Sequence, residues 1–328
     1  MKAISIKQTG AADTLEYLNV DTPTLKTGEV LVKIAAAPVN FIDTIIREGN
    51  MPPGMMPELP IIPGVEGSGT IVDANNTELK PGQKVAFLGP IGASAYAEYA
   101  AVPADRLVTL SGDADLLEAA VLPVNYFTAY HMLHNVVRAQ PGKTALIYAA
   151  SGGVGTALIQ LAKNAGLTVV GLERKAEKLA NGLSQGADFM FDTSDDNWVE
   201  QVKQATGGEG VDYIFNPVAG DTIVQDLELL KPLGHVVIFG LLGGAGETNL
   251  QAEAFKHFGK APTITYSEIY ATFFNDYPLV ESSMKALYQL LDEGKIKPVY
   301  STLPLSEAAE AHRTIEAGKV TGKLLLIP

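Results

Sequence analysis

Residues 144–173 read TALIYAASGGVGTALIQLAKNAGLTVVGLE, and this stretch decides the fold. An apolar run over residues 144–150 ends in the glycine-rich turn 151–155, after which apolar residues recur at helical spacing until the next glycine. A second apolar run over 168–172 then ends on Glu173. The succession of strand, glycine turn, helix and strand is typical of a unit that binds a dinucleotide.

The glycine turn carries the pattern G-x-G-x-x-G, with Ala150 in place of the first glycine and with Gly152 and Gly155 at the other two positions. The middle glycine lets the backbone approach a pyrophosphate, whose charge faces the amides at the helix N-terminus. Glu173 lies roughly twenty residues further on, where an acid can reach the adenosine ribose. A turn without a ligand is the alternative. The flanking elements favour a cofactor site formed by Ala150, Ser151, Gly152, Gly153, Val154 and Gly155.

The composition is that of an ordinary globular protein, with 47% hydrophobic and 19% charged residues among 328. The formal net charge of −13 opposes binding to nucleic acid or to an anionic membrane. The absence of cysteine excludes disulfides and thiolate-bound zinc, and it fits a reducing compartment. Since no stretch resembles a signal core or a membrane span, we expect a soluble, cytoplasmic protein.

The pattern of strands and turns changes along the chain and predicts two domains. Residues 1–124 contain short β runs separated by proline and glycine, as in a compact, partly barrel-like antiparallel domain. Over residues 125–262 strands and helices alternate, which predicts an α/β fold with a doubly wound parallel sheet. Residues 263–328 return to mixed character and end in the strand KLLLIP, which we expect to rejoin the first domain.

Six motifs occur along nearly the whole chain: VNFIDTIIREG, IPGVEGSG, AYAEYAAVPADRLV, AASGGVG, FGLLGG and TGKLLLIP. In these motifs and their order the sequence resembles the medium-chain dehydrogenases/reductases, in particular the zinc-free quinone oxidoreductase branch related to ζ-crystallin. The resemblance implies a GroES-like catalytic domain built from both chain ends around a central Rossmann domain. It further implies NADPH as the usual hydride donor, quinones or α,β-unsaturated carbonyls as acceptors, and a homodimer or homotetramer joined through the Rossmann sheet.

Zinc-dependent relatives place metal ligands at positions that in this chain hold Asn40, Val65 and a residue near Val124. None of these side chains can bind zinc, and the four-cysteine structural lobe is missing, so the resemblance predicts an enzyme without a metal. His131 and His134 are neighbours on a predicted helix, but no third ligand stands near them in the sequence. A surface or core role is therefore preferred for both histidines.

Hydride transfer without a metal needs another group to polarise the acceptor. Asn40 is the first candidate, because its side-chain amide can donate to a carbonyl oxygen. The alternative, which we weigh equally, is that Asn40 caps a short helix starting at Phe41. On that helix, Asp43 and Arg47 have the spacing of a surface ion pair.

The source of the final proton is where the chain departs from related reductases, which carry tyrosine at one or two positions held here by Ile45 and Met51. Neither side chain is an acid. Ile45 and Met51 are candidate substrate contacts, and Met51 with Met55 and Met56 would suit an apolar wall for a flat acceptor, with ordinary loop packing as the alternative. Tyr126 and Tyr270 are candidate catalytic acids in their place, as is Tyr266, with packing as the alternative role for each tyrosine.

The choice between NADPH and NADH depends on the end of the second strand of the opening stretch. Glu173 favours NADH, because an acid there binds the ribose hydroxyls. Arg174, Lys175 and Lys178 follow at once and favour the 2′-phosphate of NADPH, which we expect as the cofactor, with NADH as the alternative. Further predicted cofactor contacts are Thr128, Gly240 and Leu241, which rest on the resemblance. Lys323 and Lys319 are candidates for contacting a cofactor phosphate, and a solvated lysine is the preferred alternative at both positions.

We therefore expect an NADPH-dependent reductase of quinones or activated C=C bonds. An enoyl-thioester reductase is the alternative within enzymes. It needs basic residues to hold a long anionic substrate, which the acidic composition does not favour. A non-enzymatic role, as a crystallin-like or RNA-binding protein, belongs to a different class, and the net charge of −13 argues against RNA.

Overall fold

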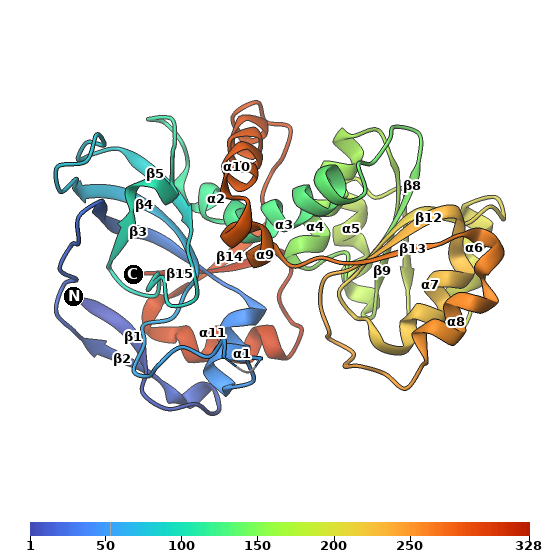
Figure 1. The fold of residues 1–328 in the computed structure, drawn as a ribbon, viewed down its shortest axis with the longest axis horizontal. Coiled ribbons are helices and arrows are strands. Elements are labelled where there is room, and N and C mark those ends of the chain that lie inside the picture. Colours follow the sequence, from blue (N-terminus) through green and yellow to red (C-terminus); the bar gives the residue numbers. More distant parts are fainter. Residues whose placement is uncertain (53) are drawn as a thin grey trace. The chain divides into compact units, whose positions relative to one another are not determined.

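The computed structural model describes residues 1–52 and 54–328, and its contacts divide the chain into two units (Figure 1). The first unit joins the two ends of the chain, Met1–Asn125 and Met284–Pro328, and the second is Tyr126–Ser283. Each unit has its own sheet and its own hydrophobic core. Among the helices of the described residues, none is long and apolar enough to cross a membrane.

The second unit is built on a 6-stranded sheet in the order β10-β9-β8-β11-β12-β13, and every neighbouring pair is parallel. Its strands are β8 (Thr144–Tyr148), β9 (Thr168–Glu173), β10 (Phe189–Asp192), β11 (Val211–Asn216), β12 (Leu230–Ile238) and β13 (Thr263–Tyr266). From β8 the chain order runs outward to β10, and from β11 it runs outward to β13 on the other side. The order therefore reverses between β8 and β11, at the kind of position where open α/β sheets bind ligands. The predicted doubly wound fold is confirmed.

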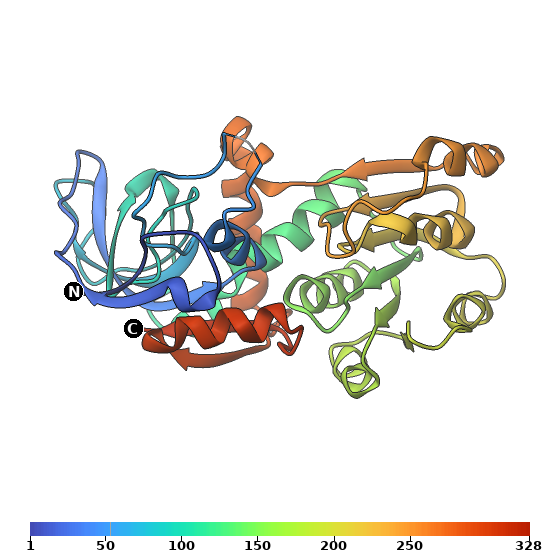
Figure 2. The same ribbon diagram turned by 90° about the horizontal axis from the view of Figure 1, so that it is seen from below.

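Short helices connect these strands and cover both faces of the sheet (Figures 1 and 2). They are α4 (Gly153–Asn164), α5 (Leu179–Ser184), α6 (Trp198–Ala205), α7 (Ile223–Leu229) and α8 (Leu250–Lys256), whereas α9 (Ile269–Asn275) follows the last strand, β13. Helices α6 and α7 bury Val202 and Leu227 against Leu146, Ile214 and Val236 of the strands. Because both faces are covered, β11 is buried along its whole length, and its sequence VDYIFN is apolar apart from Asp212 and Asn216.

The predicted helix that carries His131 and His134 extends over Leu122–Val136 and is not regular. Its π-helical turns η3 (Leu122–Tyr126) and η4 (His131–Val136) flank a short α3 (Phe127–Tyr130), which packs against α4. The 3₁₀ turns of the second unit are η5 (Ala176–Lys178), η6 (Gly220–Thr222) and η7 (Phe258–Lys260).

The second unit continues beyond Pro262, where the sequence pattern placed its end. Strand β13 follows that proline and pairs with β12, from His235 opposite Thr263 to Ile238 opposite Tyr266. With its 4 residues, β13 is too short to show as a separate β run in the pattern. The expected boundary therefore moves from 262 to Ser283, within α10 (Tyr277–Asp292).

The first unit contains a 7-stranded sheet in the order β14-β15-β3-β4-β5-β7, with β6 paired to β3, and a separate β1–β2 hairpin. Its strands are β1 (Lys2–Ile6), β2 (Leu15–Asn19), β3 (Glu29–Val39), β4 (Glu66–Asp73), β5 (Lys84–Leu88), β6 (Tyr99–Pro103), β7 (Leu107–Thr109), β14 (Tyr300–Pro304) and β15 (Lys323–Ile327). Its helices are α1 (Phe41–Glu48), α2 (Leu116–Ala120) and α11 (Ala308–Glu316), with 3₁₀ turns η1 (Ala12–Thr14), η2 (Ala104–Arg106) and η8 (Leu305–Glu307). Strand β15 pairs antiparallel with β3, which confirms that the chain end rejoins the first domain.

The strongly bent β3 organises this sheet, since it pairs with β4, β6 and β15. Its pairing with β4 shifts register between Leu31 and Val32 and again between Ile34 and Ala36, as at a β-bulge. Opposite this bend, a Cβ on Gly69 would lie 2.1 Å from the Lys33 carbonyl oxygen, so the close approach of the two strands requires glycine.

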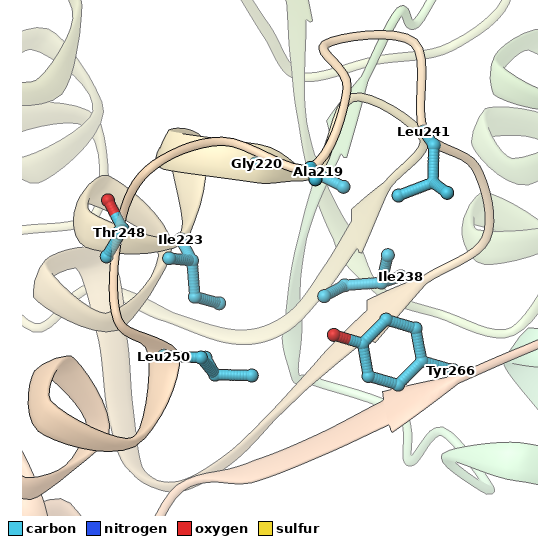
Figure 3. A pocket seen from close by; sticks show the side chains of 9 residues that line it. Ala219, Gly220, Ile223, Ile238, Leu241, Thr248, Leu250 and Tyr266 are labelled. Atoms are coloured by element: carbon cyan, nitrogen blue, oxygen red, sulfur yellow. The ribbon is translucent and has the colours of Figure 1, made fainter.

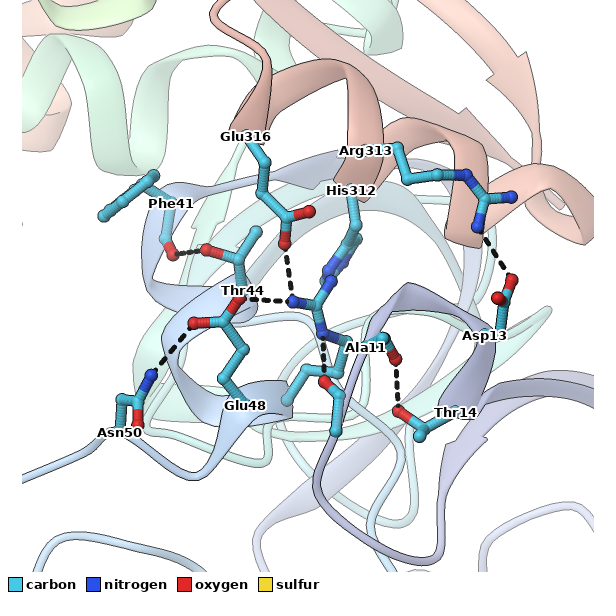
Figure 4. A network of polar contacts seen from close by, with 12 residues as sticks. Ala11, Asp13, Thr14, Phe41, Thr44, Glu48, Asn50, His312, Arg313 and Glu316 are labelled. Atoms are coloured by element: carbon cyan, nitrogen blue, oxygen red, sulfur yellow. Dashed lines mark hydrogen bonds and ion pairs between the residues drawn. The ribbon is translucent and has the colours of Figure 1, made fainter.

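Helix α1 buries two charged residues that the sequence pattern placed on its surface. Asp43 and Arg47 are 0% and 1% exposed, and they do not pair with each other. Asp43 Oδ2 accepts from the Asn40 backbone N–H and from the Tyr96 hydroxyl. Arg47 instead donates to the Gly10 carbonyl and pairs with the carboxylates of Glu48 and Glu316 (Figure 4). The expected surface ion pair is wrong because α11 packs on α1 and brings Glu316 to the guanidinium.

His312 is a fully buried histidine on α11, and its Nε2 lies 3.4 Å from the Tyr96 hydroxyl oxygen. Burial, and to a smaller extent the charge of Arg47, lowers the pKa of His312 from 6.5 to about 3. Below pH 6.5 the unfolded chain therefore takes up a proton at this histidine that the folded chain does not bind. Stability is lost as the pH falls through 6.5 towards 3.

We expect His312→Gln to weaken this dependence on pH, because glutamine stays neutral throughout. Between pH 6.5 and pH 5 the free energy of unfolding of the wild type should fall by about 2 kcal/mol more than that of the variant. Asp43, whose pKa burial raises to about 6, acts in the opposite direction in both proteins and cancels in the comparison. Urea denaturation across this range measures the difference. Equal pH slopes would show that folded His312 accepts its proton normally.

Candidate functional site

The glycine turn between β8 and α4 has the geometry of a phosphate cradle. A Cβ on Gly155 would lie 2.3 Å from the Ala149 carbonyl oxygen, so the chain itself requires glycine there for close packing of helix and strand. A Cβ on Gly152 would meet only the Ala149 oxygen, at 3.2 Å, and Gly152 has an extended φ of −74° that any residue adopts. A side chain at 152 would therefore be tight against one backbone oxygen, whereas a side chain at 155 would overlap the chain. The partly exposed space in front of it, at the N-terminus of α4, therefore fits a pyrophosphate.

Glu173 braces this turn from the end of β9. Its carboxylate is only 8% exposed; Oε1 accepts from the Ser151 backbone N–H at 2.9 Å, and Oε2 accepts from the Arg174 N–H at 3.3 Å. The Ser151 hydroxyl donates to the Lys178 carbonyl oxygen at 2.8 Å, which ties the turn to the segment after β9. The carboxylate thus has partners inside the unit, which the ribose-binding interpretation did not anticipate.

Basic side chains gather beside this acid. Arg174 is exposed, and Lys175 and Lys178 are half-buried. Burial lowers the pKa of Lys178, the nearby Glu173 charge opposes that effect, and the Lys175 charge adds to it. The two ammonium groups therefore lie close enough to repel each other.

A cavity of about 190 Å³ opens at the carboxyl ends of β11, β12 and β13 (Figure 3). Leu241 lines it together with Ile238 and the Tyr266 ring, and the side chain of Asn216 holds its rim by accepting from the N–H groups of Val218 and Ala219. Gly240 is required by the chain, because a Cβ there would lie 2.7 Å from the Pro217 carbonyl oxygen. The lining residues are Ala219, Gly220, Ile223, Ile238, Leu241, Ala245, Thr248, Leu250 and Tyr266.

A buried polar centre lies in the first unit, where β3, β4, β15 and the start of the irregular helix meet. The Lys323 ammonium donates to Asn40 Oδ1 at 2.5 Å and to Asn125 Oδ1 at 3.1 Å, and it pairs with Glu66 Oε1 at 2.7 Å. Glu66 Oε1 also accepts from Asn40 Nδ2 at 2.8 Å, and Oε2 accepts from the Val124 backbone N–H at 2.8 Å. Glu66 and Lys323 are 0% and 3% exposed.

These contacts bear on the two roles weighed for Asn40, helix capping and donation to the acceptor, and on the expected phosphate contact of Lys323. Asn40 is the N-cap residue of α1 and forms a capping box with Asp43, whose carboxylate accepts from the Asn40 N–H at 2.9 Å, and the Asn40 side-chain oxygen also accepts from Lys323. Asn40 keeps one amide hydrogen that donates to no described residue, so its proposed role as a donor remains open. The phosphate-binding interpretation of Lys323 is corrected, since its ammonium is buried with three acceptors of its own unit. Lys319 is exposed.

The remaining predicted residues have structural surroundings of their own. Tyr126 is 1% exposed and its hydroxyl donates to Gln160 at 2.9 Å. Tyr270 is 4% exposed and packs against Phe273 and Phe274. Ile45, Met51 and Thr128 are half-buried.

The histidines have neighbours typical of packing. His131 lies 3.4 Å from both Asn135 and Thr272, and His134 packs against the ring of Tyr130. Within residues 1–52 and 54–328, no group of three or more His, Cys, Asp or Glu is placed to hold a metal ion. Val65 is fully buried.

Sequence reasoning missed Glu66, Asn125 and the inward orientation of Lys323. The signal was present in part, because Glu66 belongs to the motif IPGVEGSG and Lys323 to TGKLLLIP. Glu66 and Lys323 carry opposite charges, and each lies in a motif that includes a largely apolar strand, which together indicate an internal ion pair.

Comparisons with known proteins agree with this architecture. A family model described as an alcohol dehydrogenase GroES-like domain matches residues 26–112, and one described as a zinc-binding dehydrogenase matches residues 153–286. A 2-haloacrylate reductase from a Burkholderia species is 30% identical and covers 99% of this chain and 98% of its own length. The human (Homo sapiens) quinone oxidoreductase is 29% identical over 100% of this chain and 98% of its own.

Solved structures are similar over the same extent. An Escherichia coli quinone oxidoreductase in complex with NADPH has a TM-score of 0.91 at 27% identity, with 100% of both chains covered. A quinone oxidoreductase from Pseudomonas syringae pv. tomato has a TM-score of 0.90 at 29% identity and covers 100% of this chain and 99% of its own.

Proposed function

The chain belongs to the medium-chain dehydrogenase/reductase superfamily, among its quinone oxidoreductase-like members, and on this basis we propose that it is an NADPH-dependent, metal-free reductase of quinones or α,β-unsaturated carbonyl compounds. The observation that carries the proposal is the glycine turn at α4, where the partly exposed Gly152 leaves open the space in front of the helix N-terminus that a side chain would fill. The 2-haloacrylate reductase among its relatives supports acceptors with an activated C=C bond, since its name specifies one.

The cofactor would be held wholly by residues of the second unit. The turn 150–155 would bind the pyrophosphate, Lys175 and Lys178 with Arg174 the 2′-phosphate, and Gly240 and Leu241 the nicotinamide half at the ends of β11 and β12. When bound, NADPH supplies the hydride.

The first unit would position the acceptor. The second amide hydrogen of Asn40 is donated to the acceptor carbonyl oxygen. This hydrogen bond becomes stronger as negative charge develops on that oxygen. The half-buried Ile45 and Met51 offer an apolar wall and no proton, so the proton on the carbon next to the carbonyl comes from water.

One experiment tests the function: NADPH consumption by the purified protein with quinones, enones, 2-haloacrylate and enoyl thioesters, each with and without a chelator. We expect turnover of quinones or enones that the chelator leaves unchanged. Preference for enoyl thioesters would assign the alternative enzyme, loss of turnover on chelation would contradict the metal-free mechanism, and no turnover with any acceptor would leave a nucleotide-binding protein without this activity.

The proposal extends to assembly as a homodimer or homotetramer through the Rossmann sheet. Strand β13 is the last in the sheet order, and no described strand pairs with its outer edge. Tyr266 on β13 and the nearby Phe258 are 66% and 74% exposed, which suits an edge that a second copy covers.

We predict tighter binding of NADPH than of NADH, with the preference weakened in Lys175→Ala and Lys178→Ala. Each charge-assisted contact with the 2′-phosphate is worth about 1.5–3 kcal/mol, so each loss should weaken NADPH binding about tenfold or more and leave NADH nearly unchanged. Titration of intrinsic fluorescence with both nucleotides measures this. Lys256→Ala, which removes a 67% exposed ammonium from the same unit, is the control. Tighter binding of NADH, lost in Glu173→Gln, would reverse the assignment.

A further inference from the structure

We propose that Asn125 is a second amide donor for the acceptor oxygen, paired with Asn40, and that the Lys323–Glu66 pair holds both amides in the donating orientation. The inference deepens the proposed reductase function and rests on it. It concerns only residues of the first unit.

The orientation follows from the donors and acceptors at the Lys323 ammonium. An ammonium has three N–H donors and no acceptor. Its acceptors are the side-chain oxygens of Asn40 and Asn125 and the Glu66 carboxylate. Because each asparagine turns its oxygen towards the cation, each turns its NH₂ group away from it.

Glu66 keeps this arrangement in place. Its Oε1 receives both the Lys323 ammonium and one Asn40 amide hydrogen, so a flipped Asn40 would bring its oxygen to the carboxylate and its NH₂ to the ammonium. Its Oε2 accepts from the Val124 N–H, which holds the residue directly before Asn125. Buried charges that lose a partner are costly, and so the pair strongly resists rearrangement.

The two amides retain donor capacity that the chain does not use. Asn40 donates one amide hydrogen to Glu66, and no described residue accepts the second. Asn125 is 5% exposed, and within the described chain its Nδ2 has no acceptor at all. Although both residues are largely buried, the Asn125 NH₂ group keeps access to the surface of the unit. It and the second Asn40 amide hydrogen can therefore donate to an oxygen that a ligand supplies.

The chemistry of the site selects the class of ligand oxygen. Hydride addition at the β-carbon of an enone moves the C=C electron pair towards the carbonyl carbon and leaves negative charge on the oxygen. A proton from water at the α-carbon then restores the carbonyl. Two fixed N–H donors, backed by an ammonium, stabilise the oxygen most when it is an anion, as in an oxyanion hole. The same holds for the oxyanion of a quinone that has accepted hydride.

Asn125→Asp is the sharpest variant, because the carboxylate keeps an oxygen for Lys323 and removes the donor with almost no change in shape. We expect kcat with an enone to fall about 10²-fold, with little change in KM and none in NADPH affinity. Asn76→Asp makes the same chemical change at an exposed turn of the same unit and should leave kcat unaltered. An Asn125→Asp protein with wild-type kcat would overturn the proposal.

Lys323 is tested as a positioning residue. The double variant Lys323→Met with Glu66→Gln removes both buried charges together, and Lys323→Arg keeps a cation. We expect kcat of the double variant to fall about as strongly as kcat of Asn125→Asp. Lys323→Arg, which keeps the cation, should lose less kcat than the double variant. A double variant that keeps full kcat would contradict the orienting role.

Binding of para-nitrophenol, followed by the absorbance of its phenolate, tests the donors without turnover. The wild type should lower the pKa of the bound phenol, and Asn125→Asp and the double variant should both raise it. If the wild type reduces no acceptor but still lowers the phenol pKa, and both variants raise it, the proposed function is wrong and the anion site is supported. If the wild type reduces enones but Asn125→Asp leaves the phenol pKa unchanged, the inference about Asn125 is wrong and the proposed function stands.

Discussion

Valine in place of Gly152 should abolish binding of NADPH while the second unit stays folded. The backbone at 152 is extended, so a branched side chain fits its conformation, and its Cβ would meet only the Ala149 oxygen, at 3.2 Å. The side chain would instead fill the space in front of the α4 N-terminus that the pyrophosphate needs. Charge-assisted hydrogen bonds contribute about 1.5–3 kcal/mol each, so losing two or more should weaken binding at least 100-fold, roughly.

The neighbouring glycine provides the matched control. Ala at 155 would place its Cβ 2.3 Å from the Ala149 oxygen and 2.7 Å from the Ala150 Cα, so Gly155→Ala should lower the melting temperature of the protein itself. The single tryptophan, Trp198, packs beside Tyr148 at the end of β8 and reports on both binding and unfolding of this unit. Gly152→Val with an unchanged dissociation constant and melting temperature would mean that the turn is only structural.

The fold of the second unit was open to prediction because its information is local. Each apolar run that forms β8, β9 or β11 is bounded by glycine or polar residues, and the helices between them repeat apolar residues at helical spacing. The glycine turn is local as well, which is why Gly152 and Gly155 could be identified by their spacing. Strand β13 was not predicted, because a strand of 4 residues after a proline is too short to show an alternation of apolar and polar residues.

The first unit shows where such reasoning ends. On α1 the spacing of Asp43 and Arg47 favours a surface pair, but α11 joins from the far end of the chain and buries both. The contact between Lys323 and Asn40 spans 283 positions and that between Lys323 and Asn125 spans 198. No periodicity connects residues so far apart, and a lysine looks solvated in the sequence until its strand is known to lie against β3.

Asn40→Ala should reduce kcat with an enone far more than it reduces substrate affinity. The bond from the Asn40 amide to the carbonyl oxygen strengthens as that oxygen gains charge, so its loss is felt mainly in the transition state. Removal of one such donor costs about 10²–10³ in kcat. The NADPH dissociation constant and the melting temperature serve as controls, because the variant also takes a partner from Lys323 and Glu66. A large rise in KM at constant kcat would reduce Asn40 to a binding residue.

The same reaction in heavy water, with an α-substituted enone, locates the proton. Ile45 and Met51 carry no acid, and the Tyr126 hydroxyl is already bonded to Gln160 inside the second unit, so we expect none of these three side chains to protonate the α-carbon. Water would then deliver deuterium to both faces, and the product should show poor facial preference in the wild type and in Tyr126→Phe alike. If deuterium instead arrives at one face and that preference disappears in Tyr270→Phe, the chain has a positioned acid. Asn40 then stabilises the enolate only until Tyr270 protonates it.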